Sequence, residues 1–236
     1  MPEFAAHGAE LIRVADRALY EAKEAGRNRV HVGPRTTPQV EIPIPDTGVL
    51  RSLEALADRY AAAGSRASGP TIVDTAHQLC RRLGVSVAER RRCLAAARLR
   101  DIGMVAVPPD VLAKPGPLTP GELRTVRDHV RVGMELLRAL PETRELAPIV
   151  GQHHERYDGT GYPLGIQGRR IAIEARIIAV AEAWIETSGE RGGPAARAEI
   201  LRRAERQLDP DVVAALLSLL DDGTIHMSGS AHSHAA

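Results

Sequence analysis

Apolar residues recur at helical spacing in one segment after another between residues 49 and 222, and this pattern most constrains the fold. Leu, Ile, Val and Ala return every three or four residues around 71–83, 119–140, 173–187 and 210–220. Aromatic residues make up only 3% of the chain, so aliphatic side chains have to fill the core, which favours helices. The sequence therefore predicts an all-α bundle of about seven or eight helices.

The chain divides by composition into four parts. We expect the helical domain at 49–222, after a short helix-strand stub at 1–33 and a linker rich in Pro at 34–48. Residues 223–236, rich in Ser, Gly, Ala and His, are expected to be a disordered tail. Within the domain, Thr119-Pro120-Gly121-Glu122 predicts a helix start with a capping box.

Charge and cysteine content narrow the partners and the compartment. The formal net charge is +1, so we expect no nucleic-acid partner. No segment approaches the ~20 apolar residues of a membrane span, and no signal peptide is evident, so direct membrane insertion is not expected. Cys80 and Cys93 fit no zinc or redox spacing and are expected to be buried, reduced thiols in a cytoplasmic protein.

Two adjacent histidines, His153 and His154, end an apolar segment and lead into a turn rich in Gly and Pro. Ile149 and Val150 precede them by one helical turn, so both histidines continue apolar stripes of a helix expected at about 142–154. Neutral imidazole commonly binds divalent metals. The alternative is a pair of exposed histidines at a helix end, and the pair alone leaves both readings open.

Three further polar residues face the predicted core: Asp101, His129 and Glu182. Glu182 lies in a nearly apolar run, and an unpaired buried carboxylate costs several kcal/mol, so it needs a partner or a metal. Each residue taken singly is more often structural. Together with the histidine pair they offer the mixed N and O donors of a site for iron, manganese or zinc. In hydrolytic enzymes such an ion activates water and holds phosphate.

Several motifs together carry a family resemblance: HHERYDGTGYP at 153–163, KPGPLT at 114–119, EARIIAVA at 174–181 and LDP at 208–210. Residues 64–220 resemble the HD-GYP family, a subgroup of the HD phosphohydrolases. The resemblance implies an HD-domain-like helical bundle that hydrolyses cyclic di-GMP at a centre with two or three metals. It implies Asp101 as a catalytic residue, and as metal ligands it implies Asp101, His129, His153, His154 and Glu182, the last standing where the family has Asp.

The resemblance fails at three positions of the expected site. Arg100 replaces the histidine of the His-Asp dyad, Met104 replaces a lysine near the substrate phosphate, and Ser68 falls where a further histidine ligand is expected. A guanidinium stays protonated and cannot bind a cation. We expect Arg100 to pair with Asp101 or Glu182, or else to turn out to solvent. At most one ion per chain is expected, and a metal-free protein is an equally open alternative.

The N-terminal stub resembles the last helix and strand of a GGDEF diguanylate cyclase domain at 15–23 and 26–30, but no GGDEF loop is present, which excludes cyclase activity. In the HD-GYP family the loop of Asp158, Gly159, Gly161, Tyr162 and Pro163 is implicated in contacts with GGDEF partners. The resemblance therefore predicts a catalytically impaired regulatory or interaction module that takes cyclic di-GMP or a related phosphate ligand. The alternative is a working metal-dependent phosphohydrolase, and a homodimer is left open.

Overall fold

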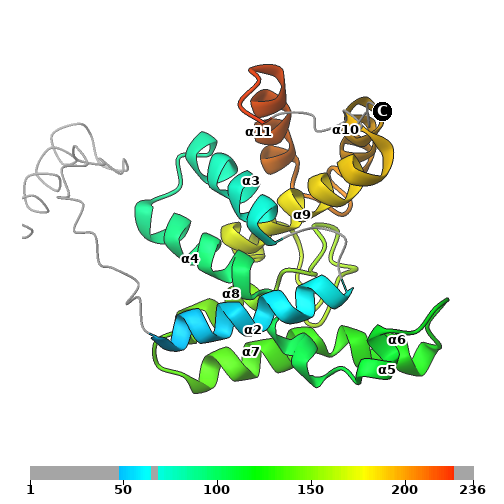
Figure 1. The fold of residues 1–236 in the computed structure, drawn as a ribbon. Helices are drawn as coiled ribbons and strands as arrows, with labels where there is room; N and C mark the ends of the chain where they lie inside the picture. Colours follow the sequence, from blue (N-terminus) through cyan, green and yellow to red (C-terminus); the bar gives the residue numbers. More distant parts are fainter. Residues whose placement is uncertain (1–47, 65–68, 226–236) are drawn as a thin grey trace, which may run out of the picture. The chain divides into compact units, whose positions relative to one another are not determined.

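The structure, a computed structural model, describes residues 48–64 and 69–225 (Figure 1). This part of the chain is helical, with eight helices of seven or more residues and one isolated bridge between Ala204 and Leu208. The predicted all-α bundle of seven or eight helices is confirmed. The stub, almost all of the linker, Ser68 and most of the tail lie outside the described residues.

The helices are α2 (Gly48–Gly64), α3 (Gly69–Arg82), α4 (Val87–Leu99), α5 (Pro109–Leu112), α6 (Pro120–Arg127), α7 (His129–Ala139), α8 (Ala147–Val150), α9 (Ile173–Arg191), α10 (Gly193–Arg203) and α11 (Pro210–Asp221), with 3-10 turns η1 (Ile102–Ala106), η2 (Arg144–Leu146) and η3 (Gly168–Arg170).

Side-chain caps fix several helix starts. Thr119 accepts a hydrogen bond from the Glu122 backbone while the Glu122 side chain accepts one from the Thr119 backbone, so the predicted capping box at α6 is confirmed. Asp209 caps α11 through the backbone amides of Asp211 and Val212 and also pairs with Arg176 of α9. These contacts set where α6 and α11 begin and tie α11 to the centre of the bundle.

The longest helix, α9, is the centre of the fold and packs against α3, α4, α8, α10 and α11 (Figure 1). Its inner face carries Ile177, Ile178 and Trp184, all fully buried. Cys80 and Cys93 are buried free thiols in the same core, as predicted. None of the described helices is long and apolar enough to cross a membrane.

A close backbone contact joins η1 to α7. A Cβ atom on Gly103 would lie 1.9 Å from the carbonyl oxygen of His129, and one on Gly133 would lie 3.3 Å from the Gly103 nitrogen. Only glycine at 103 lets the two backbones approach this closely. The contact brings the start of η1, and with it Asp101, next to the first residue of α7, which is His129.

Candidate metal centre

Two buried histidines are held by backbone carbonyl groups. His129 opens α7, and its Nδ1 lies 2.6 Å from the Val126 carbonyl oxygen. His153 lies in the turn after α8, and its Nδ1 lies 2.7 Å from the Val150 carbonyl oxygen. Because a carbonyl oxygen can only accept, each Nδ1 carries a proton, and Nε2 is the ring nitrogen that remains to bind a metal.

The Nε2 atoms of these two rings converge. The two Nε2 atoms lie 3.4 Å apart, and His154 completes a group whose ligand atoms all lie within 4.8 Å of one another. We call His129, His153 and His154 the histidine cluster. Burial lowers the pKa of His153 to about 4 and that of His154 to about 3, so both rings are neutral at pH 7.

The donor chemistry of the histidine cluster fits a divalent ion. With both Nδ1 atoms held by backbone carbonyl oxygens, the two Nε2 atoms that face each other are the ring nitrogens left to bind a metal. A cation between them would accept a lone pair from each ring. A ring that donates its other N–H to a backbone carbonyl is also the usual support for a metal-binding histidine.

Asp101 is shared between this cluster and Arg100. Its Oδ1 lies 3.6 Å from His129 Nε2, and its Oδ2 lies 3.2 Å from Arg100 Nη2. Burial disfavours the charged carboxylate, but the Arg100 guanidinium and the histidines outweigh that effect and hold the pKa of Asp101 below its usual value. Asp101 is therefore ionised at neutral pH.

Arg100 points into the site and not to solvent. Its side chain is 1% exposed, its Nε donates to Glu182 Oε1 over 3.0 Å, and its Nη1 donates to the Ala97 carbonyl oxygen over 2.9 Å. Burial opposes its charge, yet Asp101 and Glu182 raise the pKa of Arg100 above its usual value. The predicted pairing holds with both carboxylates, and the alternative in which Arg100 turns outward is wrong. Asp101 and Glu182 thus already have a positive partner.

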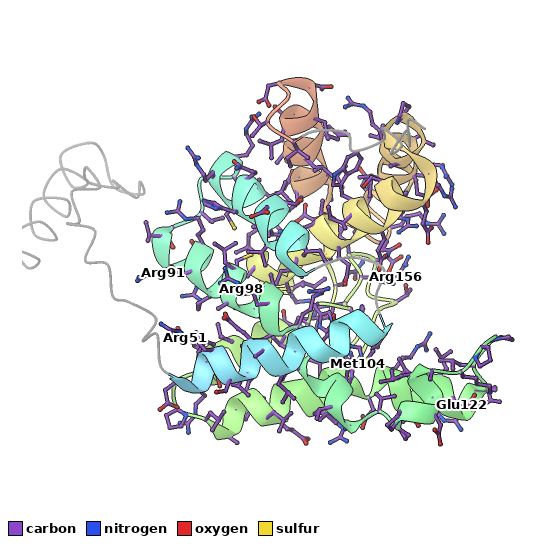
Figure 2. All side chains as sticks on the ribbon, in the orientation of Figure 1. Arg51, Arg91, Arg98, Met104, Glu122 and Arg156 are labelled. Carbon is purple, nitrogen blue, oxygen red and sulfur yellow. The ribbon has the colours of Figure 1, made fainter. Side chains whose placement is uncertain are left out.

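The remaining predicted site positions differ in what the structure says of them. Met104, labelled in Figure 2, lies half-buried in η1, where its backbone amide donates to the Asp101 carbonyl oxygen. Its thioether brings no charge to a phosphate. Ser68 lies outside the described residues. Of the five predicted ligands, the three histidines form the cluster, while Asp101 and Glu182 lie beside it on Arg100.

The loop after the histidine pair folds back onto the site. Tyr162 stacks on the His154 ring at 5.0 Å between centroids, and Arg127 lies 5.2 Å from the centroid of the Tyr162 ring. Gly161 contacts the backbone of Glu155 and Arg156 so closely that a Cβ atom would lie 2.3 Å from the Arg156 nitrogen. The loop and the histidine cluster are therefore one structural unit.

Glu155 holds this loop from inside. Its buried carboxylate accepts backbone N–H bonds from Leu164, Gly165 and Ile166 over 2.6, 3.1 and 3.2 Å. Asp158 accepts from the Thr160 amide and pairs with Arg156, while Gly159 takes a φ of 80° that favours glycine. Sequence reasoning missed the role of Glu155, because its partners are backbone amides that no residue pattern reveals.

We expect Glu155→Gln to lower the free energy of unfolding by roughly 1.5–3 kcal/mol, because the amide replaces one acceptor oxygen with a donor that faces backbone N–H groups. Urea denaturation measures the change. Glu135→Gln, on the exposed face of α7, is the matched control and should change stability by less than about 0.5 kcal/mol. Equal losses of stability in the two variants would contradict the role of Glu155 in holding the loop.

The metal-free domain should lose stability as the pH falls below 6.5. Unfolded histidines take up protons near pH 6.5, whereas folded His153 and His154 do so only near pH 4 and 3. The unfolding free energy is therefore level above pH 7 and falls by roughly 2 kcal/mol per histidine at pH 5. Denaturation in EDTA at pH 7.5, 6 and 5 tests this. If the unfolding free energy of His153→Asn falls with pH as steeply as that of the wild type, the prediction is refuted.

A cavity of about 180 Å³ opens beside the histidine cluster. Its lining combines the site residues His153, His154 and Glu182 with groups that the sequence did not single out. The added polar residues are Glu155, Arg156, Glu186, Arg203 and Gln207. The cavity thus contains imidazole, carboxylate and guanidinium groups, which can hold a cation and an anionic ligand together.

Known proteins resemble this chain in sequence. The sequence model of the HD domain family matches residues 52–212. The chain is 38% identical over 172 residues to the cyclic di-GMP phosphodiesterase response regulator RpfG of Xanthomonas campestris pv. campestris. The aligned region covers 69% of this chain and 45% of that protein. It is 37% identical over 153 residues to the 3'3'-cGAMP-specific phosphodiesterase 3 of Vibrio cholerae, covering 61% of this chain and 33% of that protein.

A solved structure shows the same fold. The cyclic GMP-AMP-specific phosphodiesterase V-cGAP3 of V. cholerae superposes with a TM-score of 0.58 at 16% identity, covering 75% of this chain and 49% of that one. At this identity the likeness concerns the fold alone. The chain spans less than half the length of each of these relatives.

Proposed function

Because the chain belongs to the HD domain family and is of its HD-GYP type, we propose that it is a metal-dependent phosphodiesterase domain for cyclic dinucleotides. One observation carries the proposal: three histidines, two of them buried and fixed with their Nε2 atoms facing each other, offer a site for a divalent ion. The curated relatives, named as phosphodiesterases for cyclic di-GMP or 3'3'-cGAMP, support this substrate class.

The protein groups divide the work in this proposal. His129, His153 and His154 would hold one iron, manganese or zinc ion, and such an ion would supply Lewis-acid chemistry. The low pKa of Asp101 makes it a weak base, so its carboxylate orients the attacking water and does not store the proton. Tyr162, stacked on His154, holds that ring in place.

Arg100 makes this a one-ion centre. Its guanidinium contacts both carboxylates that would help to hold a further cation, and its own charge repels one. It stands as a fixed positive charge where the family resemblance implies metal. With Met104 in place of lysine, less positive charge is available for the transition state, and we expect slow turnover.

A second candidate follows from the same arginine. If the ion pairs of Arg100 remove turnover altogether, the domain acts as a regulatory module that binds the dinucleotide without hydrolysis. Pro163 and Leu164 of the exposed loop, where Leu164 is 60% exposed, would then meet a GGDEF-type protein partner.

Turnover assays separate the two candidates. The purified chain is loaded with Mn²⁺ or Fe²⁺ and given cyclic di-GMP or 3'3'-cGAMP, with EDTA-treated protein as the control. We expect metal-dependent release of a linear dinucleotide. Tight binding without any product favours the regulatory module, and neither binding nor product contradicts both candidates.

A further inference from the structure

A second, larger cavity of about 530 Å³ lies beside the one at the histidine cluster. The two cavities share Arg156, Arg203 and Gln207. We call the larger one the arginine cavity, and its lining is completed by Glu199, Arg202 and Arg206. Four of its six lining residues are arginines, and of these only Arg156 lies in a sequence motif.

The charges in the arginine cavity are unbalanced. Glu199 is its single acidic residue, and that carboxylate already pairs with Arg202, Arg203 and Arg191. Arg156 pairs with Asp158, which lies outside the lining. Arg206 makes no ion pair with any residue that the structure describes. Positive charge therefore exceeds negative charge here, and the cavity suits an anion.

The cavity is tied to the metal centre through the backbone. The Tyr157 amide donates to the Gln207 carbonyl oxygen over 3.1 Å, and the Asp158 amide donates to the Arg206 carbonyl oxygen over 2.7 Å. The turn that carries Arg206 is thus fixed to the loop that follows His153 and His154. Glu205 in this turn adopts a φ of 64°, which a residue other than glycine rarely takes.

The two adjoining cavities have opposite preferences. The smaller one is lined by His153 and His154 of the histidine cluster and by Glu155, Glu182 and Glu186, and this end favours a cation, whereas the larger cavity favours an anion. A phosphate at the metal centre and a second phosphate at the arginines would satisfy both. Arginine suits this task because its planar guanidinium binds phosphate through two parallel hydrogen bonds.

We propose that Arg206, with Arg202 and Arg203, binds the second phosphate of a dinucleotide whose first phosphate lies at the histidine cluster. The inference rests on the proposed function and adds a specificity determinant to it: ligands with two phosphates are preferred over mononucleotides. Arg206 is assigned a role in binding. Because its side chain is exposed and contributes little to the core, its replacement should leave the fold intact.

Calorimetry with two ligands tests the assignment on the Mn²⁺-loaded chain. The ligands are GMP, with one phosphate, and the bis-phosphorothioate analogue of cyclic di-GMP, with two phosphodiester groups and resistance to hydrolysis. We expect Arg206→Ala to weaken binding of the dinucleotide roughly tenfold to hundredfold and to change GMP affinity by less than about twofold. Arg206→Lys, which keeps the charge without the fork, should fall between wild type and Arg206→Ala.

Arg197→Ala is the matched control, because it removes one arginine from α10 that pairs with Asp221 outside the cavity. It should leave both affinities unchanged. Equal weakening of both ligands by Arg206→Ala, or no weakening of either, would overturn the assignment. If the wild type hydrolyses cyclic di-GMP and Arg206→Ala binds the dinucleotide analogue as tightly as the wild type does, the assignment of Arg206 is overturned while the proposed function stands. Wild-type protein that takes up Mn²⁺ but binds neither ligand would overturn the proposed function as well.

Discussion

We expect His153→Ala to weaken divalent metal binding strongly and to abolish metal-dependent turnover. Replacing a residue that only supports a metal ligand lowers metal affinity by roughly 10–100-fold, and the loss of a ligand itself should cost more. His153 contributes one of the two Nε2 atoms that face each other at 3.4 Å, and its orientation is fixed by the Val150 carbonyl group. Its removal leaves two histidines, too few to hold a transition metal tightly. Metal titration followed by mass spectrometry of the dialysed protein measures the loss.

His77→Ala is the control for that experiment. His77 lies on α3 and lines neither cavity, so its replacement should leave metal content and turnover unchanged. Circular dichroism of both variants separates a lost ligand from a lost fold. Full metal content in folded His153→Ala would show that the ion does not bind at the histidine cluster.

We expect Arg100→His to raise the metal content from one ion per chain to two and to increase kcat/KM by about 100-fold, the scale of restoring one electrostatic contact in the transition state. The substitution removes a buried positive charge, frees Asp101 and Glu182, and supplies an imidazole that can bind metal. The two carboxylates, left without their cation, favour uptake of another one.

Arg98→His, in the last turn of α4 just before Arg100, is the matched control. Arg98, labelled in Figure 2, is half exposed, and its Nη1 lies 3.7 Å from Glu54 Oε1, away from the site. It should change neither metal content nor rate. If Arg100→His folds and still binds one ion with unchanged turnover, then Arg100 is not what limits this centre.

The helical fold follows from sequence because period and caps are local properties. The apolar stripe of α9 and the Thr119 capping box each depend on residues within one or two turns, and both are found as expected. The helix predicted at 142–154 is less regular: it forms as η2 and the short α8, and the histidine pair lies in a turn after Gly151. There Gly151 lies against Met134 of α7, a tertiary contact that no local pattern contains.

The candidate site was predictable in its residue types but not in its connections. The histidines could be recognised because they continue apolar stripes. The direction of Arg100 could not, because it is decided by Glu182, more than eighty residues away on α9. Likewise Arg156, Arg203 and Arg206 meet only through the packing of the loop after α8 against the turn after α10.

The most direct test of this account is the metal content of the wild-type chain after saturation with Mn²⁺ or Fe²⁺ and removal of excess ion. We expect one ion per chain, held by His129, His153 and His154, with Arg100 as the fixed charge beside it. Two ions per chain would contradict the role given to Arg100. No bound ion would contradict the metal centre itself.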